Sequence, residues 1–249
     1  MNIETAAVRP PDTSKCGHML AHYLPEDCFC HGRAPTGQRF AYVMPQHTAS
    51  RSIVSLLYHD LGQETCYHTH HVPNAKLLAC LNITFVFSFV AHPYRRVLSG
   101  AIARGDIDSA LHRNDTSARD AMVHRFRSLV RENANDVGGW SRSNLQAETL
   151  QQYKSSGLLK YVGRVGRLED DLRHVLVSQL GFKLGHVDFE RRNSRYCFAS
   201  CGDRDPTSAS RPSWYDAPTA ELVQRWAAAD FAQFGFSKEV DSMWGWAGQ

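Results

Sequence analysis

The chain has 249 residues, of which 43% are hydrophobic, and carries 28 lysines and arginines against 25 aspartates and glutamates. This length allows one α/β domain with a large core and leaves little room for a second. The formal charge of +3 suits a pocket for a small anionic ligand and falls short of the strong basic stripe that is usual in nucleic-acid-binding proteins.

Targeting and redox signals point to a soluble protein. Residues 1–10 hold no apolar run of signal-peptide length, and no later run reaches the roughly 18 apolar residues that a membrane helix needs. The seven cysteines are an odd number in a chain too long to need a disulfide scaffold, so reduced thiols are expected. Their spacings lack the repeat of a zinc knuckle, so we expect no structural metal. We therefore predict a cytoplasmic protein without a membrane partner.

The chain begins with a segment that disfavours long regular structure. Pro10, Pro11, Pro25 and Pro35, with scattered glycines, interrupt residues 1–38. We predict an N-terminal arm over residues 1–38 and a single domain over residues 39–249.

A first strand-loop-helix unit follows the arm. The uncharged residues 40–44 predict a buried strand that Pro45 ends, and apolar residues at helical spacing predict a helix over 53–61. In this order the helix N-terminus faces the carboxyl end of the strand, where free N–H groups and the helix dipole favour an anion. The loop between them supplies hydroxyl donors and a positive charge from Thr48, Ser50, Arg51 and Ser52. It lacks the glycines and the Gly-Lys pair of a Walker A motif, and an ordinary capped turn is the alternative interpretation.

A second unit of the same kind carries the strongest strand signal in the chain. Residues 83–90 are dominated by Ile, Val and Phe without alternation, as in a central parallel strand that is buried on both faces. Pro93 fits the first turn of the next helix, which also carries Arg95 and Arg96. Two arginines at a helix start oppose the helix dipole unless an anion binds there; a solvated basic turn is the alternative.

The rest of the chain predicts further α/β structure. Helical patterns cover residues 116–130, 144–154 and 218–234, and a third strand-loop-helix unit combines a strand over 158–162 with a helix over 168–180. The predicted fold is α/β, a single domain with a central parallel sheet flanked by helices.

Three histidines lie between the two anion-binding loops, at His68, His70 and His71. A histidine titrates near neutrality and can accept a proton from an attacking hydroxyl, so this segment is a candidate for a general base. Solvated loop residues are the alternative, and a metal site ranks last because no His-Glu-x-x-His arrangement is present.

In combination these motifs resemble the sulfotransferases that use 3'-phosphoadenosine 5'-phosphosulfate (PAPS), in particular the heparan sulfate and uronyl 2-O-sulfotransferase branch. The family loop Pro-Lys-Thr-Ala-Ser-x-Ser is similar to residues 45–52, and the family motif Arg-Asp-Pro-x-x-Arg-x-x-Ser matches residues 91–99 at Pro93, Arg96 and Ser99. The Tyr-His-x-His pattern of that branch matches Tyr67-His68-Thr69-His70. The likeness is good over about residues 40–100. Two family residues are replaced: His47 stands at the place of the loop lysine, and Ala91 at that of the first arginine.

The resemblance implies a P-loop-like strand-loop-helix that binds phosphosulfate, and a sulfuryl transfer from PAPS, released as PAP, to a hydroxyl or amine of a small-molecule acceptor. His70 or His68 would be the general base and His47 would stabilise the departing phosphate. The donor-binding residues would be His47, Thr48, Ala49, Ser50, Arg51, Ser52, Arg96 and Ser99. A glycan acceptor is less expected, because the sequence shows no membrane anchor. The alternatives are a noncatalytic basic module of the same fold that binds anionic polymers, and an atypical nucleotide-dependent phosphotransferase.

Overall fold

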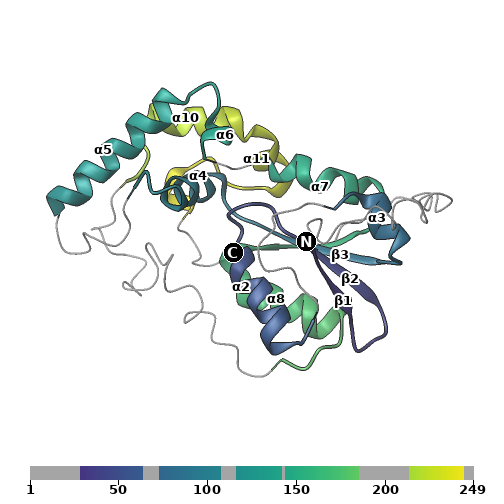
Figure 1. The fold of residues 1–249 in the computed structure, drawn as a ribbon. Helices are drawn as coiled ribbons and strands as arrows, with labels where there is room; N and C mark the ends of the chain where they lie inside the picture. Colours follow the sequence, from purple (N-terminus) through teal and green to yellow (C-terminus); the bar gives the residue numbers. More distant parts are fainter. Residues whose placement is uncertain (1–28, 64–72, 108–115, 142–143, 185–212, 244–249) are drawn as a thin grey trace. The chain divides into compact units, whose positions relative to one another are not determined.

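The computed structural model describes residues 29–63, 73–107, 116–141, 144–184 and 213–243. The chain forms two compact units, each of which is described by itself (Figure 1). The first unit comprises Met1–Val90 and Glu148–Val187, and the second comprises Ala91–Ala147 and Asp188–Gln249.

The first unit is built on a four-stranded sheet in the order β1-β2-β3-β4. Its strands are β1 (Cys30–Arg33), β2 (Arg39–Val43), β3 (Phe85–Val90) and β4 (Leu159–Arg164). The pairs β2/β3 and β3/β4 are parallel, with Phe40 opposite Phe85 and Phe87 opposite Tyr161. Every residue of β3 is buried, as its continuous apolar sequence predicts. The prediction of an α/β fold with parallel central strands is confirmed.

The edge strand β1 makes the sheet mixed, which the sequence did not predict. It runs antiparallel to β2, with Cys30 opposite Tyr42, and a turn from Ala34 to Gln38 joins the two strands. Gly37 in this turn has a φ of 82°, which glycine adopts without strain. Residues 30–33, counted above with the arm, thus belong to the sheet, while residues 1–28 lie outside the described part of the chain. The sequence Cys-His-Gly-Arg gives no strand signal, since it lacks β-branched residues.

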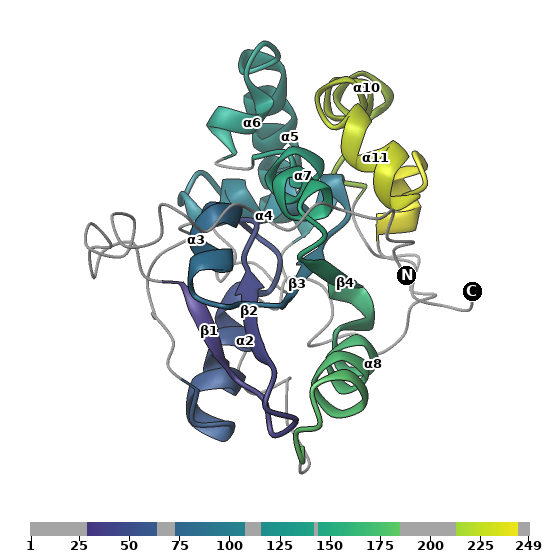
Figure 2. The ribbon, with the colours of Figure 1, turned by 90° about the vertical axis from the view of Figure 1, so that its right-hand side faces the viewer.

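Helices lie on both sides of this sheet. On one side are α2 and α8, and on the other are α3 and α7 (Figures 1 and 2). The predicted helices over 53–61 and 168–180 are confirmed, but each passes from an α-helix into a π-helix, and the first begins three residues early. The helical bounds are α2 (Ser50–Ser55), η2 (Leu56–Asp60), α3 (Ala75–Cys80), α7 (Gln146–Ser155), η3 (Val165–Arg167), α8 (Leu168–Arg173) and η4 (His174–Gln179).

Two local features of the first unit departed from the sequence pattern. The short helix α3 was not predicted; Asn74 caps it by accepting hydrogen bonds from the N–H groups of Lys76 and Leu77. Gly163 and Arg164, expected in a loop, extend β4. A Cβ at Gly163 would lie 2.4 Å from Cε1 of Phe89, so the neighbouring strand leaves room only for glycine there.

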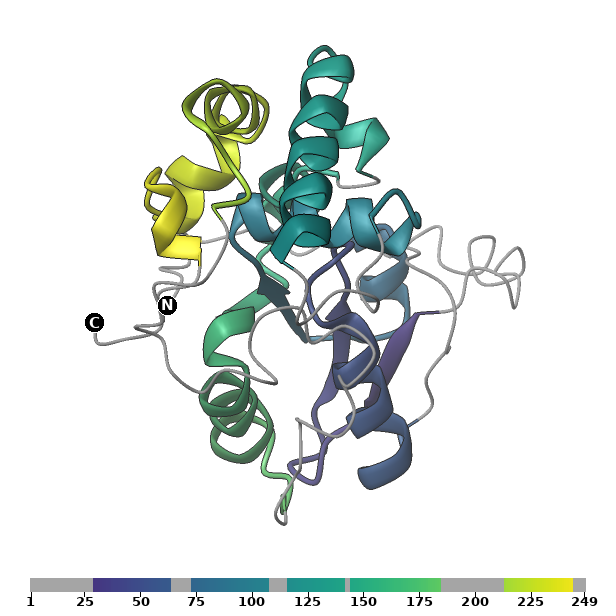
Figure 3. The same ribbon diagram turned by 90° about the vertical axis from the view of Figure 1, so that its left-hand side faces the viewer.

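The second unit is helical within its described residues. Its elements are α4 (Pro93–Ala103), α5 (Thr116–Glu132), α6 (Val137–Trp140), α10 (Ala217–Trp226), α11 (Ala228–Phe234) and η5 (Val240–Met243). The helix α10 packs against α4 and α5 (Figure 3), and the core between them includes Tyr94, Phe126, Trp140, Trp214 and Phe231. The single helix expected over 218–234 is divided at Ala227, and α6 was not predicted.

Cys80, the last residue of α3, is disulfide-bonded. The other described cysteine, Cys30, is buried and forms no disulfide. The expectation of reduced thiols is therefore wrong for Cys80. Because disulfides persist mainly in oxidising compartments, the bond weighs against the expected cytoplasmic location. Separately, none of the helices in the described ranges combines the length and apolarity needed to cross a membrane.

Cys80→Ser is expected to lower the free energy of unfolding by about 2–4 kcal/mol, because the bond restricts the unfolded chain. Urea unfolding of the purified protein, with and without reductant, measures this difference. Peptide mapping without reduction should find Cys80 cross-linked and Cys30 alkylated only after unfolding. Alkylation of Cys80 in the unreduced, unfolded protein would contradict the bond.

Candidate functional site

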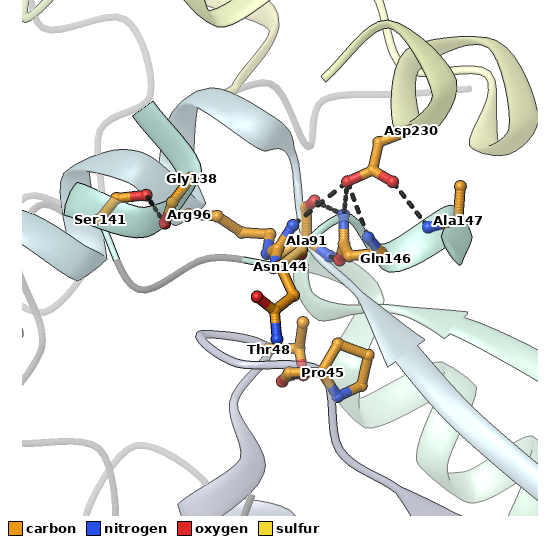
Figure 4. A network of polar contacts seen from close by, with 10 residues as sticks. All are labelled: Pro45, Thr48, Ala91, Arg96, Gly138, Ser141, Asn144, Gln146, Ala147 and Asp230. Carbon is orange, nitrogen blue, oxygen red and sulfur yellow. Dashed lines mark hydrogen bonds and ion pairs between the residues drawn. The ribbon is translucent and has the colours of Figure 1, made fainter. Parts of the chain in front are cut away.

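The loop from Pro45 to Ala49 joins the carboxyl end of β2 to α2. The end of β2 is held by Ser88 of β3, whose Oγ donates a hydrogen bond of 2.8 Å to the carbonyl oxygen of Val43. Within the loop, Oγ1 of the buried Thr48 donates a hydrogen bond of 2.6 Å to the carbonyl oxygen of Pro45 (Figure 4). Thr48 therefore stabilises the turn itself, and its side chain does not point into solvent.

Two residues of this loop, His47 and Ala49, have left-handed backbone conformations, with φ of 61° and 59°. For residues with a Cβ this conformation costs roughly 1–2 kcal/mol each. Ala49 is the N-cap of α2, and its carbonyl oxygen accepts hydrogen bonds from the N–H groups of Ser52 and Ile53. A left-handed residue followed by right-handed helical residues orients successive N–H groups toward one point, an arrangement that binds anions.

Ala49→Gly is expected to raise the free energy of unfolding by about 0.5–1 kcal/mol, because glycine adopts a positive φ without a Cβ clash. Equilibrium urea unfolding measures this gain. A matched variant, Ala41→Gly in the buried strand β2, should instead destabilise the protein, since a strand gains nothing from a positive φ. Equal losses in both variants would contradict the left-handed conformation of Ala49.

Tyr42 of β2 lies buried close to this loop. Its ring stacks on that of Phe87, with centroids 5.2 Å apart. Burial raises the pKa of the Tyr42 hydroxyl strongly, Cys30 adds to this rise, and the nearby Thr48 hydroxyl lowers it in part. Tyr42 therefore remains a neutral phenol, and its hydroxyl lies near Thr48 beneath the loop.

The structure places the predicted donor-binding residues of the first unit as follows. His47 and Ala49 are half-buried in the loop, whereas Ser50 and Ser52 are buried in the first turn of α2 and not in the loop. The backbone of Arg51 belongs to the same turn. The side chains of Thr48, Ser50 and Ser52 are buried, so their hydroxyl groups do not face solvent as the predicted donor role requires. The role of the backbone N–H groups of residues 48–52 in anion binding stays a prediction.

The predicted general bases, His68 and His70, lie outside the described residues, as does His71. Their roles remain predictions from the sequence.

In the second unit, α4 begins at Pro93, as predicted, with His92 as its N-cap. Ser99, on the same helix, is half-buried. Arg96 is fully buried: its Nη1 lies 3.2 Å from Oδ2 of Asp230, and its Nη2 donates to the carbonyl oxygen of Asn144. Burial lowers the pKa of the Arg96 guanidinium to about 10, while the charge of Asp230 raises it in part.

Asp230 is the centre of a buried polar cluster, which Figure 4 shows. Besides Arg96, it accepts hydrogen bonds from the backbone N–H and side-chain amide of Gln146, each 3.1 Å, and from the N–H of Ala147 at 2.7 Å. Gln146 and Ala147, the first two residues of α7, belong to the second unit with Asp230. Asp230 thus places a negative charge at the helix start, where the helix dipole favours one. The Gln146 amide in turn pairs with both backbone groups of Ala91.

This cluster changes the interpretation of Arg96. Its charge is matched inside the second unit, so its placement does not support the expected role of gripping a phosphate. Sequence reasoning missed Gln146 and the pairing of Arg96 with Asp230, because 134 residues separate the two and no local pattern links them.

Neither a metal site nor a similar known protein adds to these observations. No group of three or more histidine, cysteine, aspartate or glutamate side chains within the described ranges is arranged to hold a metal ion. No protein-family model matches this sequence, and neither the curated proteins nor the solved structures compared with it include a significant match.

Proposed function

We propose that this chain is a sulfotransferase that moves a sulfuryl group from PAPS to a hydroxyl or amine of a small-molecule acceptor. The observation that carries the proposal is the turn between β2 and α2, with its left-handed His47 and Ala49. Strained conformations of this kind persist mainly where a loop is shaped for binding. The turn coincides with the sequence motif that resembles the phosphosulfate loop of sulfotransferases.

The chemistry requires little more than positioning and charge stabilisation. The acceptor oxygen or nitrogen attacks the sulfur, the bond from sulfur to the 5'-phosphate oxygen breaks, and PAP leaves with the electron pair. The N–H groups of residues 48–52 would hold the 5'-phosphosulfate, and a protonated His47 would stabilise the charge that develops on the departing phosphate. His70 or His68 would accept the acceptor's proton.

Calorimetry of the full chain with PAP, followed by transfer assays with ³⁵S-labelled PAPS on acceptor pools, tests the proposal. Heat of binding together with labelled product supports it. Magnesium-dependent ATP binding with no PAP binding would instead favour the phosphotransferase. Salt-sensitive binding of a sulfated polymer, with no affinity for either nucleotide, would favour the noncatalytic module.

A further inference from the structure

The turn between α3 and β3 carries a modification pattern that the proposed function does not use. Residues Asn82-Ile83-Thr84 fit the Asn-x-Ser/Thr pattern of N-glycosylation acceptors, and the middle residue is not proline. A glycan is bulky and hydrophilic, so its acceptor must lie at the surface. Asn82 and Thr84 are exposed, whereas Ile83 between them is buried and anchors the turn. The other match to the pattern begins at Asn114, which lies outside the described residues.

The backbone at Asn82 forms the C-terminal cap of α3. Its φ of 53° is left-handed, a conformation that asparagine adopts more readily than most residues. The N–H of Asn82 donates a hydrogen bond of 2.9 Å to the carbonyl oxygen of Ala79, and the N–H of Ile83 donates one of 2.9 Å to residue 78. These two bonds make a Schellman motif, which uses main-chain groups only. The cap therefore does not depend on the side-chain amide of Asn82, and a sugar on that amide would break neither bond.

The hydroxyl of Thr84 also contributes little to the fold. The main-chain N–H of Thr84 donates a hydrogen bond of 3.1 Å to the carbonyl oxygen of Arg39, which fixes the start of β3 beside β2. Oγ1 of Thr84 lies 3.5 Å from the same oxygen, at the outer limit for a hydrogen bond. Neither polar side chain of the pattern is thus required by the turn in which it stands.

The disulfide bond at Cys80 is a second, independent observation. Cys80 lies two residues before Asn82 and is disulfide-bonded. Disulfides form and persist in oxidising environments such as the lumen of the endoplasmic reticulum. An Asn-x-Ser/Thr pattern is a glycosylation acceptor in proteins that enter the secretory route. The disulfide and the exposed pattern therefore indicate the same compartment.

We propose that Asn82 is an N-glycosylation site. The co-substrate is an oligosaccharide carried on a polyprenyl diphosphate, and an oligosaccharyltransferase of the cell catalyses the transfer. Nδ2 of Asn82 attacks the anomeric carbon of the first sugar, so that a new N–C bond forms while the C–O bond to the diphosphate breaks. The diphosphate leaves with the electron pair, and Nδ2 loses one proton.

The topology of the first unit separates this site from the loop between β2 and α2. The strands β2 and β3 are parallel, and the loop follows the carboxyl end of β2, whereas Asn82 precedes the amino end of β3. A glycan on Asn82 is therefore attached at the opposite edge of the sheet. The modification is independent of the proposed function, and the failure of either leaves the other standing.

Expression in the secretory pathway tests the site. The full chain is directed into this pathway in eukaryotic cells by a cleavable signal sequence, purified, and treated with peptide-N-glycosidase in ¹⁸O-labelled water. This enzyme converts a glycosylated asparagine into labelled aspartate, so peptide mapping should find the label at position 82. Unmodified Asn82 in protein whose Cys80 is cross-linked would overturn the proposal.

Matched variants assign the label to this acceptor pattern. Asn82→Gly suits the positive φ and Thr84→Val keeps a β-branched side chain, so both should fold and both should lose the label at position 82 completely. Thr84→Ser preserves the pattern and should keep the label, as should Asn114→Gln, which removes only the other match. A glycan on Asn82 in Thr84→Val, or its loss in Asn114→Gln, would contradict the assignment.

Discussion

Asp230→Asn is expected to lower the free energy of unfolding by about 3–5 kcal/mol, because it leaves the buried charge of Arg96 without a counter-ion. The side chains of Arg96 and Asp230 are both fully buried, so water cannot solvate the guanidinium of Arg96 in the variant. The change also weakens the cap of α7, since the Asp230 carboxylate accepts hydrogen bonds from the N–H groups of Gln146 and Ala147. Urea unfolding followed by circular dichroism measures the effect.

Two further variants isolate the cause. Asp241→Asn, at an exposed position in η5, should change the free energy of unfolding by less than about 0.5 kcal/mol. The double variant Arg96→Met with Asp230→Asn should be less destabilised than the sum of its single changes, because it contains neither buried charge. Additive losses would mean that Arg96 and Asp230 act independently and would contradict the ion pair.

The central sheet could be predicted from the sequence because its signal is local. The apolar runs in β2 and β3 are typical of buried strands, and burial of both faces follows from such a run. The strand β4 has a weaker signal, because it contains the exposed Lys160. The elements that escaped prediction are short. The four residues of β1 and the six of α3 depend on pairing with β2 and on the cap from Asn74, and neither is visible as a pattern.

The candidate site, too, could be predicted from the sequence only in part. The position of the turn between β2 and α2 could be predicted, since strand, polar loop and helix follow in order. The left-handed conformations of His47 and Ala49 could not, because a positive φ is uncommon for any residue other than glycine and no pattern in the loop marks it. The role of Arg96 was likewise out of reach, since its partner Asp230 comes from a helix distant in sequence.

Replacing the general base is expected to have the largest effect on turnover. If His70 accepts the acceptor's proton, His70→Ala should lower kcat roughly 10²- to 10⁴-fold and leave PAP binding unchanged, because the base acts on the acceptor and not on the donor. His68→Ala is the parallel variant, and the larger loss identifies the base. Transfer of ³⁵S from labelled PAPS, measured under single-turnover conditions, reports the chemical step.

The pH profile distinguishes a base from a residue that only shapes the segment. A histidine base must be neutral to accept a proton, so kcat/KM of the wild type should fall below a pH of about 6.5, and this decline should be lost in the variant that lacks the base. His124→Ala, at an exposed position on α5, is the control and should keep both the rate and the profile. Undiminished turnover in both His68→Ala and His70→Ala would remove the base from this segment. The proposed donor-binding role of residues 47–52 would not be affected by that result, because neither His68 nor His70 is assigned to donor binding. PAP binding tests that role separately.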